Sequence, residues 1–238
     1  GAHTHHFTFG ENLGAPDCGV PSGPFPYRPT RQPVVIDWWR QSPGPPPAPP
    51  GTPLTTVASW KQSGKDIEWR GELYLWSKHH EFLRFVELPS RTPERLELAL
   101  ACRDPEVLAL LRRHGWRIRD AIALTRDILP YREYLQRSRG EFTVAKDQYV
   151  RLRSGWFSDR SACYLAAGRP VITQETGFSH VLPTGKGLFA FTSLDDALAA
   201  LDSLAADYDG HCRAAAQVAA EHFAAEAVVR RLCEQSGL

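Results

Sequence analysis

Residues 155–177 read Gly155-Trp-Phe-Ser-Asp-Arg-Ser-Ala-Cys-Tyr-Leu-Ala-Ala-Gly-Arg-Pro-Val-Ile-Thr-Gln-Glu-Thr-Gly177, and this stretch decides the fold of the 238-residue chain. Ser158 is a favoured N-cap residue, Gly168 suits the position just past a helix, and Pro170 opens an apolar run. The stretch therefore predicts a helix, a turn and a buried strand in succession. That order sets a helix N-terminus beside a strand end, where backbone amides can receive an anion.

The rest of the chain alternates strand-like and helix-like segments. The strand-like runs are Leu54–Ser59, Leu96–Leu100, Trp116–Leu124, Glu141–Ala145, Arg169–Gln174 and Gly187–Phe191. Helices are expected at Trp76–Val86, from Asp104 to Gly115, at Tyr131–Ser138 and from Ser193 towards the C-terminus. The alternation predicts an α/β fold, a Rossmann-like parallel sheet with helices on both faces. Ligands of such sheets bind outside the carboxyl ends of the strands.

Residues 1–51 differ from the rest in composition. Strand-like runs at His5–Phe9 and Pro33–Trp39 flank a region rich in glycine and proline, and they are too short to form a domain. Ser42–Pro53 is proline-rich and typical of a stiff linker. We therefore expect two parts, residues 1–51 and a Rossmann-like domain at residues 52–238.

Composition limits the classes of function. With 42% hydrophobic and 23% charged residues, the chain is typical of soluble globular proteins, and its net charge of +1 favours neither nucleic acid nor an anionic membrane. No apolar run is long enough to cross a membrane. The absence of methionine favours a fragment or a processed chain, with chance omission as the alternative.

Cysteines and histidines do not form a metal-binding pattern. The five cysteines are odd in number and scattered, which favours reduced thiols in a cytoplasmic protein. His5 and His6 are adjacent on a predicted strand and so point to opposite faces. No carboxylate or cysteine stands at a companion spacing, so we expect no metal site.

Residues 155–177 resemble the donor-binding segment of GT-B glycosyltransferases, nucleotide-sugar enzymes built of two facing Rossmann-like domains. Seven residues fall in register with the pattern of the retaining branch: Phe157, Ala166, Gly168, Pro170, Val171, Ile172 and Gly177. Two carboxylates that hold the sugar and the ribose in that family are replaced here by Gly155 and Cys163. The resemblance thus implies a nucleotide-diphosphate site in which the contacts to the sugar differ.

The resemblance also implies an activity and partners. Residues 52–238 would be the C-terminal, nucleotide-sugar-binding half of a GT-B hexosyltransferase-like enzyme, and residues 1–51 a remnant of its N-terminal acceptor domain plus a linker. Sugar would pass from a nucleotide-diphosphate sugar to an acceptor hydroxyl, without a metal or other cofactor. Transfer would need an N-terminal domain or a partner subunit, so we expect the chain alone to bind a donor without efficient transfer. The rival interpretation is a non-catalytic nucleotide- or sugar-phosphate-binding module, or a degenerate partner domain, which the loss of both carboxylates favours.

Candidate donor-binding residues cluster near predicted strand ends. Lys146 follows the fourth strand, and Arg153 and Arg160 flank the helix start, where cations suit a diphosphate. Ser158 and Asp159 begin that helix, and Asp159 can accept a bond from a ribose or sugar hydroxyl or merely favour the helix dipole. Ordinary solvated surface charge is the alternative for each cation.

Two further loops carry candidates. Lys61, Gly64 and Lys65 follow the first strand, in a loop that the resemblance sets opposite the donor phosphates. It is not a Walker loop, because Gly64-Lys65 is followed by Asp66 rather than Ser or Thr. Glu175, Thr176 and Gly177 follow the fifth strand, where the resemblance implies contact with the sugar or ribose. An ordinary turn is the alternative there.

Overall fold

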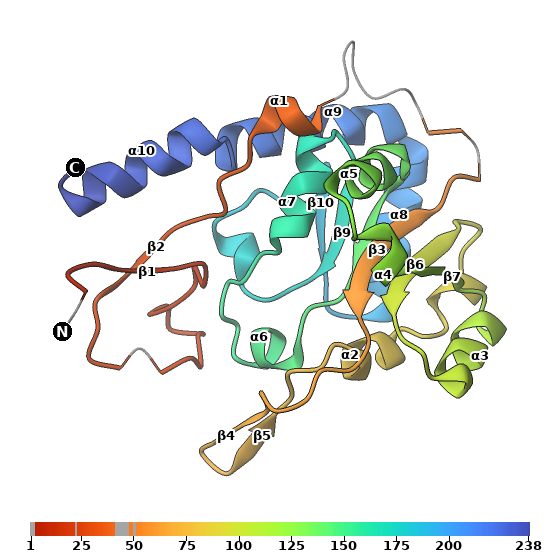
Figure 1. Ribbon diagram of the computed structural model, residues 1–238, viewed down its shortest axis with the longest axis horizontal. Helices are drawn as coiled ribbons and strands as arrows, with labels where there is room; N and C mark the ends of the chain where they lie inside the picture. Colours follow the sequence, from red (N-terminus) through yellow and green to blue (C-terminus); the bar gives the residue numbers. More distant parts are fainter. Residues whose placement is uncertain (1–2, 22, 41–47, 50) are drawn as a thin grey trace.

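A computed structural model describes every residue except 1–2, 22, 41–47 and 50. Its centre is a six-stranded sheet in the order β10-β9-β8-β3-β6-β7, in which every neighbouring pair is parallel (Figure 1). The strands are β3 (Leu54–Ser59), β6 (Leu96–Ala101), β7 (Arg117–Asp120), β8 (Gly140–Thr143), β9 (Val171–Gln174) and β10 (Leu188–Phe191). The predicted parallel α/β sheet is confirmed.

Helices cover both faces of the sheet, as predicted. One face packs against α2 (His79–Arg84), α3 (Pro105–Arg113) and α8 (Leu194–Ala206). The opposite face packs against α1 (Ile36–Trp39), α5 (Ile128–Arg137), α7 (Asp159–Ala166) and α9 (Tyr208–His222). The chain ends in α10 (Ala225–Ser236), which extends away from the sheet in Figure 1.

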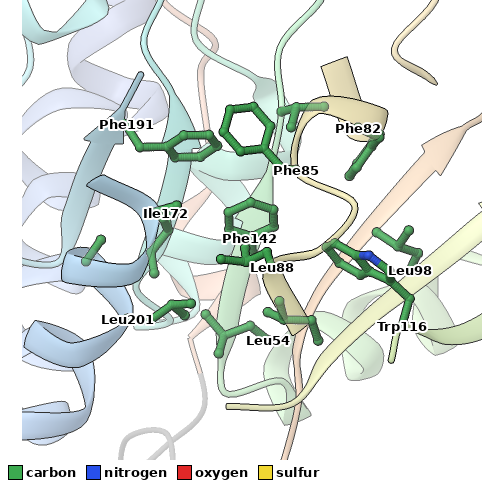
Figure 2. Close-up of a cluster of buried hydrophobic side chains, with 14 of the residues drawn as sticks. Leu54, Phe82, Phe85, Leu88, Leu98, Trp116, Phe142, Ile172, Phe191 and Leu201 are labelled. Carbon is green, nitrogen blue, oxygen red and sulfur yellow. The ribbon is translucent and has the colours of Figure 1, made fainter. Parts of the chain in front are cut away.

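An aromatic core fills the space between the sheet and α2, α3 and α8. Figure 2 shows Phe142 of β8 at its middle, with Phe191 and Phe85 nearby. The rings of Phe142 and Phe191 are stacked with centroids 5.2 Å apart, and Phe85 meets Phe191 edge-on at 5.0 Å. Offset and edge-on aromatic pairs add to the free energy gained from burial. The core therefore fixes β8 and β10, and with them the loops at their carboxyl ends.

The remaining short elements lie outside the main sheet. They are β1 (His6–Thr8), β2 (Tyr27–Pro29), the hairpin β4 (Ile67–Trp69) and β5 (Glu72–Tyr74), α4 (Ala121–Leu124), α6 (Asp147–Arg151) and two 3₁₀ turns, η1 (Leu88–Ser90) and η2 (Phe178–His180). β1 pairs with β2 in parallel, and the β4–β5 hairpin projects from the carboxyl edge of the main sheet (Figure 1). Among the described helices none is both long and apolar enough to cross a membrane.

Three predictions about local structure are wrong. Pro33–Trp39 is not a strand: Val34 makes a single bridge to Ala224, and the chain then turns into α1, which packs on α7. The third strand ends at Asp120, because this carboxylate caps α4 by accepting from Ile122 N and Ala123 N. The first predicted helix is shorter than expected, since α2 begins at His79. The proline-rich linker falls largely outside the described residues.

The deciding stretch folds as predicted. Ser158 is the N-cap residue of α7, and the apolar stripe of that helix is fully buried. Gly168 follows Ala167, the C-cap residue of α7, with a φ of 68°, and its N–H donates to Leu165 O while Arg169 N donates to Tyr164 O. Glycine adopts this left-handed backbone conformation without strain. The chain then enters β9, which is buried throughout.

Candidate functional site

A hollow of about 190 Å³ opens at the carboxyl ends of β8 and β9. The segments that line it come from the start of α2, the end of β8, α6, the start of α7 and the end of β9. The lining residues are Lys78, Thr143, Val144, Ala145, Lys146, Tyr149, Trp156, Ser158, Asp159, Arg160, Thr173 and Gln174. We call it the edge pocket. It brings together four of the predicted residues, Lys146, Ser158, Asp159 and Arg160.

The N-terminus of α7 points hydrogen-bond donors into this region. Ser158 makes no side-chain capping bond, and its hydroxyl instead lies 3.5 Å from Asp159 Oδ1. The amides of the first helical turn, which have no partner within a helix, are therefore not satisfied by the usual cap. Such amides, together with the helix dipole, bind phosphate or carboxylate groups.

Two ammonium groups line the edge pocket, and we call Lys78 and Lys146 the pocket lysines. Burial, and then repulsion from Arg160, lower the pKa of Lys78 to about 7. Burial, and then Lys65, lower the pKa of Lys146 to about 8, and its Nζ lies 3.0 Å from the centroid of the Trp76 ring. Neither ammonium has a hydrogen bond or an ion pair with the described residues. A bound anion would stabilise the charged form of each lysine, which burial disfavours.

Arg160 is a lining residue of the edge pocket whose guanidinium is held by three hydrogen bonds. Its Nε donates to Glu141 Oε1 at 2.5 Å, Nη1 to Val57 O at 2.7 Å and Nη2 to Thr143 Oγ1 at 2.9 Å. Glu141 is completely buried on β8, so the guanidinium neutralises a carboxylate inside the protein. Arg160 therefore ties α7 to β3 and β8 in the wall of the edge pocket.

The loop after β3 lies beside the pocket and does not line it. Lys65 O accepts a bond from Gln148 Nε2 at 2.9 Å, and Lys65 Nζ lies 5.0 Å from the Trp76 centroid, on the ring that Lys146 also approaches. Gly64 has a φ of 79° with open space around it, and Lys61 is exposed. A role for Lys61, Gly64 and Lys65 in binding stays a prediction.

Of the other predicted residues, Arg153 and Gly177 lie against the N-terminal segment that contains Asn12 and Asp17. Arg153 Nε donates to Asp17 Oδ2 at 2.6 Å. The Glu175 carboxylate accepts from Gly177 N within its own turn, and Thr176 Oγ1 donates to Trp156 O at 2.6 Å. These four residues do not line the edge pocket, so a ligand role for them stays a prediction.

Asn12 explains why residue 155 is glycine. The Asn12 amide donates from Nδ2 to Arg153 O at 2.8 Å, and its backbone N donates to Ser154 O at 3.3 Å. A Cβ on Gly155, whose φ is 77°, would stand 2.3 Å from Asn12 N. The N-terminal segment thus occupies the space into which a larger side chain at residue 155 would extend.

Cys163 offers no replacement for a carboxylate. It lies on α7, where burial and then the negative charge of Asp159 raise the pKa of its thiol to about 12. The thiol is neutral at physiological pH. Among the described residues, Asp159 is the only acid that lines the edge pocket, and its side chain is exposed.

Sequence reasoning missed Lys78. The residue directly precedes α2, which follows the β4–β5 hairpin in the chain, and it lines the pocket beside the ends of β8 and β9. The sequence prediction included Lys78 in a helix at Trp76–Val86. Placing the start of that helix at the carboxyl edge of the sheet would have identified Lys78 as a candidate. Among the described residues no three histidine, cysteine or acidic side chains gather in a way that could hold a metal ion.

Comparison with known proteins gives matches in structure alone. No family model and no curated protein matches the sequence. A sucrose-phosphate synthase from Thermosynechococcus elongatus matches with a TM-score of 0.58 at 14% identity, over 89% of this chain and 52% of the synthase. Anabaena Alr3699/HepE, solved with UDP-glucose, matches with a TM-score of 0.56 at 11% identity, over 89% of this chain and 58% of its own. This is the fold of about half of a GT-B glycosyltransferase.

A third solved structure that matches is also a glycosyltransferase by its name. AviGT4, a glycosyltransferase involved in avilamycin A biosynthesis, has a TM-score of 0.52 at 14% identity, over 88% of this chain and 57% of its own. The chain therefore spans about half the length of the solved structures that it matches. The GT-B likeness is one of fold, and the edge pocket is the feature from which a function is argued.

Proposed function

We propose that the edge pocket binds the diphosphate of a nucleotide-sugar donor, and that the chain is the donor-binding part of a GT-B-type glycosyltransferase. The observation that carries the proposal is the convergence at one strand edge of two lysines that form no ion pair with the described residues and of a helix N-terminus without a side-chain cap. A matching protein, HepE, was solved with UDP and with UDP-glucose, which supports a nucleotide-diphosphate ligand here.

The residues would assist transfer by stabilising the leaving group. When the bond between the sugar and the diphosphate breaks, negative charge grows on the diphosphate oxygens. Lys78, Lys146 and the first-turn amides of α7 would already face that charge, which lowers the barrier without reorganisation at the moment of reaction. Arg160 would keep the helix in place through its bonds to β3 and β8. Transfer itself would require an acceptor site on another domain or subunit.

A second candidate is a binding module without transfer activity. It is favoured because Asp159 is the single acid that the described residues bring to the pocket, and because Asn12 packs on Gly155; together these leave few groups for sugar hydroxyls. The two candidates share the diphosphate site and differ only in the chemistry that follows.

Calorimetric titration with UDP, GDP, ADP and dTDP, each with and without its sugar, tests the shared site. At least one diphosphate should bind, and Lys78→Gln and Lys146→Gln should each weaken binding about tenfold or more, since a hydrogen bond to a charged group contributes roughly 1.5–3 kcal/mol. Lys186→Gln is the matched control, because Lys186 is exposed and does not line the pocket. If no diphosphate binds, both candidates fail. If one binds, a sugar-transfer assay with an N-terminal domain supplied separates enzyme from module.

A further inference from the structure

A second hollow, of about 290 Å³, lies at the other half of the sheet, around the carboxyl ends of β6 and β7. β3 separates these strands from β8, where the edge pocket begins. Four arginines line it from separate segments: Arg103 after β6, Arg112 on α3, Arg119 on β7 and Arg126 after α4. We call it the arginine hollow.

The charges in the arginine hollow are unbalanced. Among the described residues, Asp120 is the only acid that lines it, and its Oδ1 caps α4 by accepting from Ile122 N at 2.8 Å. Arg119 Nε donates to Glu97 Oε1 at 3.0 Å. The side chains of the other three arginines have no hydrogen bond or ion pair with any residue that the structure describes. In a chain of net charge +1, this is a local excess of positive charge.

The floor of the arginine hollow is apolar. Leu100, Leu108 and Ile118 line it between β6, α3 and β7. Leu100 belongs to the buried aromatic core, and the partly buried Leu108 and Ile118 pack against that core. A ligand there would meet hydrocarbon below and guanidinium groups at the rim. Guanidinium groups bind phosphate oxygens in a two-pronged geometry, which an ammonium cannot match. The apolar floor favours an ester with an organic group over a bare inorganic ion.

We propose that the arginine hollow binds an organic phosphate monoester, with the phosphate held by Arg103, Arg112 and Arg126 and the organic group on the apolar floor. The site is distinct from the edge pocket and does not depend on its function. The monoester can be a free metabolite or the end of a larger phosphorylated glycan. Both sources present the same group to the arginines.

Phenyl phosphate is the probe, because it combines a phosphate with a flat apolar group. Hydrogen–deuterium exchange should show protection within residues 101–126, and calorimetry should show tighter binding than for inorganic phosphate. Arg103→Gln with Arg126→Gln should weaken phenyl phosphate binding at least tenfold, whereas Arg113→Gln, an exposed neighbour of Arg112 that does not line the hollow, should leave it unchanged. Circular dichroism confirms that the variants fold.

Three outcomes would overturn the proposal: no protection within residues 101–126, equal binding of phenyl and inorganic phosphate, or unchanged binding by Arg103→Gln with Arg126→Gln. Protection that is confined to residues 143–160 and lost in Lys78→Gln would assign the phosphate to the edge pocket alone. Conversely, a failure of the edge pocket leaves protection of residues 101–126 intact. Comparing phenyl phosphate with a phosphorylated oligosaccharide then distinguishes the two sources of the monoester.

Discussion

Gly155→Ala should cost much more stability than an ordinary substitution of a left-handed glycine. Its φ of 77° carries a penalty of roughly 1–2 kcal/mol for alanine. The new Cβ would also stand 2.3 Å from Asn12 N and 2.8 Å from Asn12 Cβ, so the N-terminal segment must move. Moving it breaks the two bonds that Asn12 makes to Ser154 O and Arg153 O, about 2 kcal/mol more. The expected loss is therefore about 3–4 kcal/mol.

Gly71→Ala is the matched control for that measurement. Gly71 has the same φ of 77°, in the β4–β5 turn, and a Cβ there would meet nothing within 4 Å. Urea unfolding should show a loss of roughly 1–2 kcal/mol for Gly71→Ala, the backbone penalty alone. Limited proteolysis should show faster cleavage near residues 10–19 in Gly155→Ala only. Equal losses in the two variants, with unchanged proteolysis, would refute the claim that Asn12 is packed on Gly155.

Three further predictions concern stability and pH. Arg160→Met should cost about 3–5 kcal/mol in urea unfolding because it leaves Glu141 buried without its cation, and adding Glu141→Leu should recover much of that loss; no recovery would argue against the buried pair. Asp104→Ala should cost about 1 kcal/mol since its carboxylate caps α3, whereas Ser158→Ala, which removes no capping bond, should change stability by less than about 0.5 kcal/mol. Diphosphate affinity should fall as pH rises through about 7 and 8, where the pocket lysines lose their protons before binding; calorimetry at a series of pH values checks this, and a flat profile would exclude them as ligands.

The sequence predicted the parts of the fold that depend on local signals. Asp104 followed by Pro105 marks a helix start, and the Gly168 turn marks a helix end, because each signal acts on its own neighbours in the chain. The strand prediction for Pro33–Trp39 is wrong because it also rested on local signals alone. Its β-branched and aromatic residues favour a strand in isolation, but packing against α7 holds the last four as a helix.

The candidate site was only partly predictable because its parts meet through long-range contacts. Lys146, Ser158 and Asp159 lie close together in the chain and were found. Lys78 lies beyond the β4–β5 hairpin in the chain, and no local sequence pattern predicted that hairpin. Asn12 contacts Arg153 over a separation of 141 residues, so neither the packing on residue 155 nor the use of Arg153 as an anchor for the N-terminal segment could be predicted from the sequence.

A crystal structure of the chain with the tightest-binding nucleoside diphosphate tests the central claim most directly. The account predicts phosphate oxygens within hydrogen-bond distance of the first-turn amides of α7 and of the Nζ atoms of both pocket lysines. Phosphates bound elsewhere on the protein, with Lys78 and Lys146 making no contact to them, would contradict it.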